Sequence, residues 1–174
     1  MIRAVLNEEH FRDVLALAVG HCRRRLFIAT ADLKDVHFPG GGGSAVSVVD
    51  VFDELSRRGV EIRLLHSGVP SAPLLAELKR RVPAGLTMRR CPRVHAKAVI
   101  VDGLRMYVGS ANLTGAGLGA KSPRRRNFEA GVWTDELALI DPVADMLDGI
   151  WSGAHCGACG RREHCPVPLE EPRL

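Results

Sequence analysis

The stretch that decides the fold reads VHAKAVIVDGLRMYVGSANLT over residues 94–114. Its apolar residues are rich in β-branched side chains, which predicts one strand over residues 94–101 and a second over residues 105–108. Asp102 and Gly103 stand between the two, and Asp-Gly is a typical two-residue hairpin turn. The sequence therefore predicts a β-hairpin here.

This hairpin carries a group of polar side chains. His95 and Lys97 are two residues apart and therefore share one face of the first predicted strand. Ser110 and Asn112 come just past the returning strand, after Gly109, whose missing side chain lets the backbone approach a ligand. We expect the four polar side chains to converge on one small volume.

The spacing of these residues resembles the motif of the phospholipase D superfamily, H-x-K-x4-D-x6-G-S-x2-N in its commonest form. Here the string runs from His95 through Asp102 to Gly109-Ser110, with Asn112 following as Gly-Ser-Ala-Asn. The resemblance covers residues 1–152 and extends to Glu129, which is similar to the family's trailing acidic element. One departure is a longer and more basic insertion over residues 115–126.

The resemblance implies a phosphodiesterase. His95 would attack phosphorus as a neutral imidazole and form a phosphohistidine, and a second histidine would protonate the leaving oxygen. Lys97 and Asn112 would hold the equatorial oxygens, so no metal or other cofactor is implied for catalysis. Glu129 would orient His95 through a hydrogen bond, and Ser110 completes the expected catalytic set.

Two of the motif residues also have plainer interpretations. The motif makes Asp102 a catalytic candidate, whereas its place in an Asp-Gly turn favours turn formation. Glu129 lies in FEAGVW, a predicted strand, and pairing with an arginine is the alternative to orienting His95.

The chain carries a single copy of the motif, whereas larger members of the superfamily carry two copies that meet across a pseudo-twofold axis. A single copy is similar to the small bacterial endonuclease branch. It implies a C2 homodimer in which His95 attacks and His95 of the partner subunit acts as the acid.

Composition predicts one compact domain with a short tail. The chain has 174 residues and 46% apolar content, enough for a substantial core. It contains no 18-residue apolar run, so no membrane span is expected. The N-terminal residues lack the apolar core of a secretory signal, so we expect a cytoplasmic protein whose cysteines form no disulfide set. Residues 1–152 would form the catalytic domain and residues 153–174 a Cys/His-rich metal-binding tail.

The predicted fold class is α/β, a phospholipase D-like sheet flanked by helices on both faces. A loop over residues 32–44 ends in four glycines. It lacks the G-K-[ST] ending of a phosphate loop, so we interpret it as a flexible rim of the site. The expected helices are 9–22, 46–58, 72–81 and 136–151, and the expected strands besides the hairpin are 25–30, 60–66, 86–91 and 128–133.

The net charge of +4 and the sequence pI near 9.0 come from clustered arginines and lysines. Basic groups around a phosphodiester site attract a polyanion, so nucleic acid, DNA or RNA, is the expected partner. An anionic lipid surface or a plain basic surface are the alternatives. The chain has few aromatic residues, which favours backbone contacts over base stacking. The substrate-binding candidates are Arg93, Lys121, Arg124, Arg125 and Arg126.

The tail reads HCGACG over residues 155–160 and HCP over residues 164–166. Cys-x2-Cys followed by Gly is typical of a zinc knuckle, and Cys165 would be a third ligand. The first interpretation is a structural zinc site. The alternatives are an iron–sulfur cluster, whose C-x2-C-x5-C-P pattern would recruit a distant cysteine, and free thiols. The fourth ligand would come from Cys91, Cys22, His155 or His164, and the ligand set we favour is Cys156, Cys159, Cys165, His164 and Cys91.

Two other functional classes remain open. The same histidines would serve a phospholipid hydrolase or transferase, and a non-catalytic nucleic-acid-binding subunit is the second alternative. The intact motif counts against the latter. A helicase or restriction-type partner that delivers the substrate is compatible with all of these observations.

Overall fold

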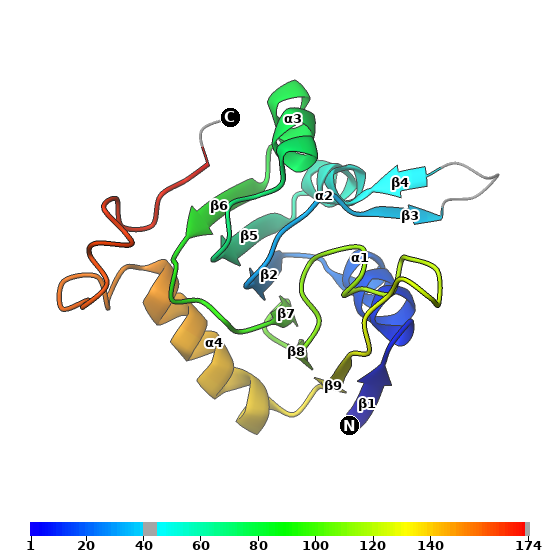
Figure 1. The fold of residues 1–174 in the computed structure, drawn as a ribbon. Helices are drawn as coiled ribbons and strands as arrows, with labels where there is room; N and C mark the ends of the chain where they lie inside the picture. The colour runs from blue at the N-terminus through cyan, green and yellow to red at the C-terminus, as the bar shows by residue number, and fades with distance from the viewer. Residues whose placement is uncertain (40–44, 173–174) are drawn as a thin grey trace.

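The computed structural model describes residues 1–39 and 45–172. In this part of the chain, seven strands form one mixed sheet in the order β1-β9-β8-β7-β2-β5-β6 (Figure 1). Strands β2, β5 and β6 run parallel to one another, and the remaining pairings in this sheet are antiparallel. A separate two-stranded sheet pairs β3 with β4. The strands are β1 (Ile2–Leu6), β2 (Arg25–Thr30), β3 (His37–Pro39), β4 (Ala45–Ser47), β5 (Glu61–His66), β6 (Leu86–Arg90), β7 (Ala98–Val101), β8 (Arg105–Gly109) and β9 (Ala130–Thr134).

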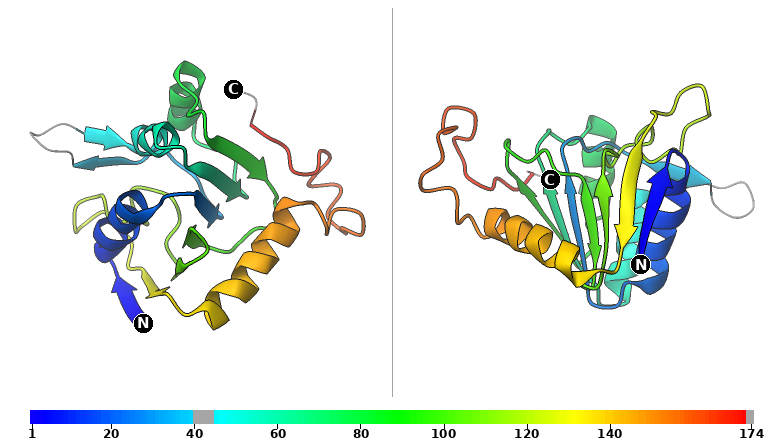
Figure 2. Two further views of the ribbon diagram at one scale, coloured as in Figure 1. Left: turned by 180° about the vertical axis from the view of Figure 1, so that it is seen from behind. Right: turned by 90° about the horizontal axis from the view of Figure 1, so that it is seen from below.

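Helices cover both faces of the sheet, as Figure 2 shows. On one face lie α1 (Ala16–His21), α2 (Val48–Arg57) and α3 (Ala72–Arg80), whose apolar side chains share one core cluster. On the other face α4 (Leu137–Trp151) packs against a second cluster. The predicted α/β class with a helix layer on each face is confirmed. None of the helices in the described part of the chain is long and apolar enough to span a bilayer.

Several predicted boundaries were wrong. The first helix begins as a π-helix over His10–Leu15 before α1, and residue 46 belongs to β4 rather than to the helix that follows. The hairpin's first strand begins only at Ala98, so His95 and Lys97 precede it in an irregular segment. The last strand starts at Ala130 instead of residue 128. The glycine run at residues 40–43, interpreted as a loop, lies outside the described residues.

Strand β1 was missed altogether. It pairs antiparallel with β9 from Ile2–Thr134 to Leu6–Ala130 and forms one edge of the sheet. Only Val5 among its five residues is buried, so the apolar alternation that identifies a half-buried strand is weak. Its structure depends on a partner strand more than 120 residues away in the sequence.

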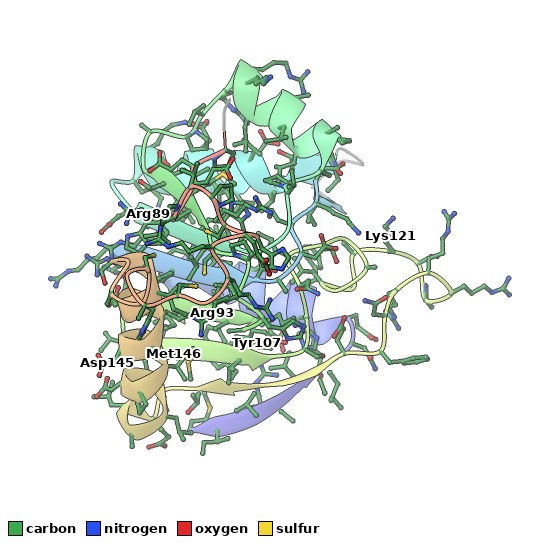
Figure 3. The ribbon with its side chains drawn as sticks, turned by 60° about the vertical axis from the view of Figure 1, so that its left-hand side comes forward. Arg89, Arg93, Tyr107, Lys121, Asp145 and Met146 are labelled. Carbon is green, nitrogen blue, oxygen red and sulfur yellow. The ribbon has the colours of Figure 1, made fainter. Side chains whose placement is uncertain are left out.

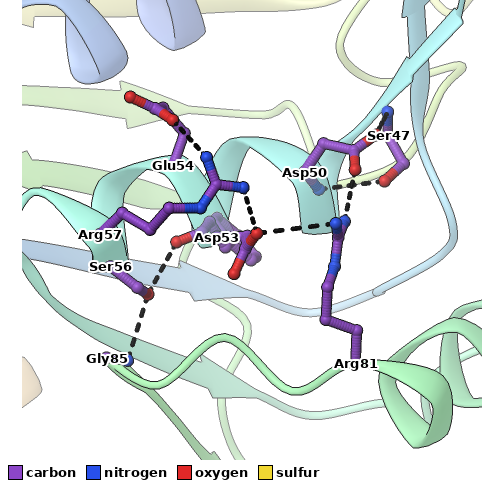
Figure 4. Close-up of polar contacts among 9 residues, drawn as sticks. Ser47, Asp50, Asp53, Glu54, Ser56, Arg57, Arg81 and Gly85 are labelled. Carbon is purple, nitrogen blue, oxygen red and sulfur yellow. Dashed lines mark hydrogen bonds and ion pairs between the residues drawn. The ribbon is translucent and has the colours of Figure 1, made fainter.

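Reciprocal capping fixes the start of α2 (Figure 4). The Asp50 backbone N–H donates to Ser47 Oγ at 3.1 Å, and the Ser47 N–H donates to Asp50 Oδ2 at 2.9 Å. Arg81, which follows α3, pairs with Asp50 and lies 3.6 Å from Asp53. These contacts hold the second and third helices together on one face of the sheet.

Asp102 occupies the predicted hairpin turn. Asp102 and Gly103 both have positive φ, 55° and 72°, as a type I′ turn requires. The Asp102 carboxylate accepts backbone hydrogen bonds from Arg24 at 2.8 Å and from Arg23 and Arg25 at 3.0 Å. Burial disfavours its charged form, but these donors outweigh burial and hold the pKa of Asp102 below its usual range. Asp102 therefore anchors the start of β2.

Candidate active site

The β7–β8 hairpin brings the motif residues to one end of the sheet. Ala98 pairs with Val108, and the Gly109 N–H donates to the Lys97 carbonyl at 3.1 Å. Because the strands are antiparallel, the segment before β7 and the segment after β8 emerge at the same end. His95 and Lys97 lie on the first of these segments, and Ser110 and Asn112 on the second. Asp102 lies at the opposite end of β7, away from them.

His95 and Lys97 are in direct contact. Lys97 Nζ lies 3.1 Å from His95 Nδ1 and 3.3 Å from Nε2. His95 is exposed. An imidazole ring and a cation thus share one accessible point at the end of the sheet.

Asn112 is anchored by its side-chain oxygen. Its Oδ1 accepts from the backbone N–H of Asp32 at 3.0 Å and of Ala31 at 3.1 Å, and from Thr30 Oγ1 at 3.3 Å. Three donors on this atom identify it as the carbonyl oxygen and leave the NH2 group as the donor for a ligand. The end of β2 and the segment after it thus fix the orientation of this amide.

Glu129 is held differently from the sequence expectation. Its carboxylate accepts from Ser110 Oγ and, at 2.9 Å, from Asn127 Nδ2. Ser110 Oγ also accepts from the Ala130 N–H at 3.0 Å. Strands β8 and β9 pair with Gly109 opposite Gly131, which brings Ser110, just after β8, close to Glu129, just before β9. Within the described residues of this single chain, the expected hydrogen bond from Glu129 to His95 is not formed.

Sequence reasoning missed Tyr107, the only tyrosine of the chain. Its buried hydroxyl accepts from the Ala111 N–H at 3.2 Å, and burial raises the pKa of Tyr107 to about 12. A Cβ at Gly109 would meet Tyr107 Oη at 2.4 Å and the Ala130 carbonyl oxygen at 2.6 Å. The motif glycine is therefore needed because Tyr107 and β9 close on it. Tyr107 is a positioning residue for the segment that carries Ser110.

Two of the predicted substrate-binding arginines are engaged elsewhere. Arg126 forms an ion pair with Glu8 at 3.0 Å and is only 23% exposed. Arg93 Nη1 lies 3.7 Å from Cys159 Sγ, so its guanidinium group points toward the tail (Figure 3). Spacing along the sequence gave no signal for either contact, because both partners lie far away in the chain.

The other three candidates lie on the basic insertion. Arg124 and Arg125 are exposed. Lys121 lines a pocket of about 350 Å³ together with Lys34, Asp35, His37 and Thr114. Thr114 is two residues beyond Asn112, so this pocket adjoins the motif segment. Its charge is mixed, because Asp35 lines it and Lys34 pairs with Asp32 at 2.9 Å.

The cysteines divide into two groups. Cys22 is buried, and its Sγ lies 3.7 Å from Asp102 Oδ1, away from the tail. The other four, Cys91, Cys156, Cys159 and Cys165, line one pocket. His164 is exposed and lies 3.1 Å from Glu163, outside that lining. In residues 1–39 and 45–172, no three His, Cys, Asp or Glu side chains are arranged to hold a metal ion, and the ligand set stays a prediction.

Comparison with known proteins agrees with this architecture. A family model described as cardiolipin synthase, PLD-like domain, matches residues 18–151. The match covers well over half of the chain, so the protein belongs to the phospholipase D-like family, as the motif predicts. No match was found among curated proteins.

Solved structures share the fold at low sequence identity. Nuc, a phospholipase D family member from Salmonella typhimurium, is 15% identical with a TM-score of 0.64, and the alignment covers 100% of this chain and 99% of Nuc. NucT from Helicobacter pylori is 13% identical with a TM-score of 0.63, covering 87% of this chain and 97% of NucT. TrmBL2, an archaeal chromatin protein with a novel mode of DNA binding, is 16% identical with a TM-score of 0.53, and the alignment covers 87% of this chain and 52% of TrmBL2.

Proposed function

We propose that this protein is a phosphodiesterase that cleaves nucleic acid through a phosphohistidine at His95. The observation that carries the proposal is the contact between His95 and Lys97 at the end of the sheet where Asn112 offers its NH2 group. A nucleophile, a cation and an oriented neutral donor are the groups that phosphoryl transfer needs.

The reaction would proceed in two displacements. A ring nitrogen of His95 attacks phosphorus, so that a P–N bond forms while the P–O bond to the leaving group breaks. The leaving oxygen takes its proton from a second imidazole. Water then attacks phosphorus, the P–N bond breaks, and the water proton passes to that second imidazole. Lys97 and Asn112 stabilise the charge on the equatorial oxygens in both steps.

We propose that the second imidazole is His95 of the partner subunit in a C2 homodimer. The exposed apolar side chains of one sheet face support this assignment. Ile2 and Leu6 on β1 and Val108 on β8 are 61%, 50% and 37% exposed, on strands that β9 joins. Helix α4 packs elsewhere, chiefly against residues of β2, β5 and β7. A second copy covering this face would lie beside Ser110, directly after β8.

Nucleic acid is the substrate class that the charge distribution supports best. The exposed Lys121, Arg124 and Arg125 of the insertion offer contacts for several phosphates. Such contacts are independent of base identity. We propose a nuclease with little sequence preference, acting in the cytoplasm.

Cleavage of labelled single- and double-stranded DNA and RNA in excess EDTA tests the activity. Wild type and His21→Ala should cut, because His21 ends α1 at the end of the sheet far from the motif. His95→Ala should not cut. When a single turnover of wild type is quenched at neutral pH, mass analysis should show one nucleic-acid fragment joined through phosphorus to a histidine nitrogen. An acid quench should remove this adduct, because the P–N bond is acid-labile. If His95→Ala cuts as well as wild type, or if lipid headgroups are released instead of nucleotides, the proposal is wrong.

Mixing experiments test the shared site. If each site needs His95 from both subunits, exchange of equal amounts of wild type and His95→Ala leaves about one quarter of the activity expected from undiluted wild type. Independent sites leave about one half. A result of one half would keep the phosphodiesterase and overturn the shared site.

A further inference from the structure

A pocket of about 280 Å³ lies between the tail and the segment that leads to His95. Four of the chain's five cysteines line it. Cys91 comes directly after β6, and Cys156, Cys159 and Cys165 come from the tail after α4. The fold thus brings Cys91 into one pocket with three tail thiols that lie 65 or more residues further along the chain.

All four thiols are free and partly exposed, and none is part of a disulfide. The remaining cysteine is a useful contrast, because Cys22 is fully buried in the core around the other face of the sheet. Buried single cysteines are common as small apolar side chains. Four thiols around one open pocket instead have the composition of a metal site.

The room inside the pocket distinguishes a single ion from a cluster. Zinc holds each sulfur at about 2.3 Å, which brings the four sulfurs to about 3.8 Å from one another around one ion. The four thiols here line an open space of about 280 Å³. In an iron–sulfur cluster each thiolate binds a different iron, so the four sulfurs surround a space instead of converging on a point.

We propose that Cys91, Cys156, Cys159 and Cys165 bind a 4Fe–4S cluster in this pocket. Zinc was the first interpretation of the sequence, and the arrangement of the thiols around a cavity favours the cluster. The proposal does not depend on the nuclease activity proposed above.

The surroundings of the pocket suit a cluster. Met146 and Ile150 of α4 and Leu169 of the tail line it with apolar surface. A cluster bound by four thiolates carries net negative charge, and Arg93 stands at the rim with Nη1 at 3.7 Å from Cys159 Sγ. Hydrogen bonds and cations near the ligating sulfurs stabilise such a centre.

The position of Cys91 gives the cluster a structural role. The Cys91 N–H donates to the His66 carbonyl at the end of β5, and its own carbonyl accepts from the Val94 N–H, both at 2.9 Å. His95 is the next residue after Val94. A cluster bound to Cys91 would therefore fasten the tail to the segment that delivers the nucleophile.

Metal analysis of the full chain, purified without oxygen from iron-supplied cells, tests the proposal. We expect about four irons and four acid-labile sulfides per chain, with the visible charge-transfer absorption of a cluster. Cys159→Ser and Cys165→Ser should lose most of the iron and sulfide. Cys22→Ala and His164→Ala should keep both, because neither side chain lines the pocket.

Circular dichroism of each variant shows whether it is folded, and only folded variants are compared. One zinc per chain without sulfide would overturn the cluster in favour of a single ion. Metal-free wild type would overturn the metal site altogether, and so would unchanged iron in folded Cys159→Ser and Cys165→Ser.

Discussion

The side-chain oxygen of Asn112 has a structural role and its NH2 group has the proposed catalytic role, and substitution can separate the two. Its oxygen accepts from two backbone N–H groups and the Thr30 hydroxyl at 3.0–3.3 Å. Its NH2 group is the proposed donor to the phosphate. Asn112→Ala removes both functions, whereas Asn112→Asp keeps an acceptor for the backbone and replaces the donor with a negative charge.

The expected stability change follows from the donors that lose their acceptor. An unsatisfied buried donor costs about 1–3 kcal/mol. Ala31 and Asp32 are only partly buried, so water compensates part of that cost. For Asn112→Ala we expect a loss of about 2–3 kcal/mol, or roughly 5–10 °C in Tm at about 2–4 °C per kcal/mol. For Asn112→Asp we expect a change within about 1 kcal/mol.

Activity should follow the other end of the side chain. Loss of one preorganised donor to a developing negative charge typically costs about 10²–10³-fold in kcat. Asn112→Asp should lose at least that much, because its carboxylate also repels the phosphodiester. Thermal melting and EDTA-resistant cleavage by folded protein measure the two effects. The reasoning is refuted if Asn112→Ala is as stable as wild type, or if Asn112→Asp remains active.

Three further predictions concern packing and pH. Gly109→Ala should lose about 1–3 kcal/mol of stability, because its Cβ would meet Tyr107 Oη at 2.4 Å. The control Gly20→Ala has nothing within 4 Å of its Cβ, so its melting temperature should be no lower than that of wild type. The pKa of Asp102 is lowered in the folded protein, so its stabilising effect is present above the unfolded pKa near 3.9 and is lost as pH falls through the folded pKa. The difference in unfolding free energy between wild type and Asp102→Asn, measured by denaturant titration, should therefore shrink toward pH 3. Cleavage by Asp102→Asn at pH 7 should be unchanged. Burial lowers the pKa of His66, so below about pH 6.5 only the unfolded state takes up its proton and the free energy of unfolding falls on acidification. His66→Asn should reduce this dependence of the unfolding free energy on pH. An unchanged dependence contradicts the lowered pKa of His66.

The hairpin shows how far local sequence determines this fold. The β-branched residues and the Asp-Gly turn are local features of the sequence, and both strands and the turn formed as predicted apart from the late start of β7. Most helices and strands were likewise found to within a few residues. Strand β1 was missed because its stability comes from pairing with β9, which its own five residues do not encode.

The motif gave the family and the end of the sheet at which the site forms, because its spacing is a local property of a hairpin. Only the tertiary structure decided what each side chain contacts. It placed Glu129 on Ser110, tied the Asn112 oxygen to the segment after β2, and turned Arg93 toward the tail. It also gathered Cys91 with three tail cysteines and left Cys22 in the core. These contacts join segments far apart in the chain, and the packing of the sheet and helices, which no local pattern records, brings them together.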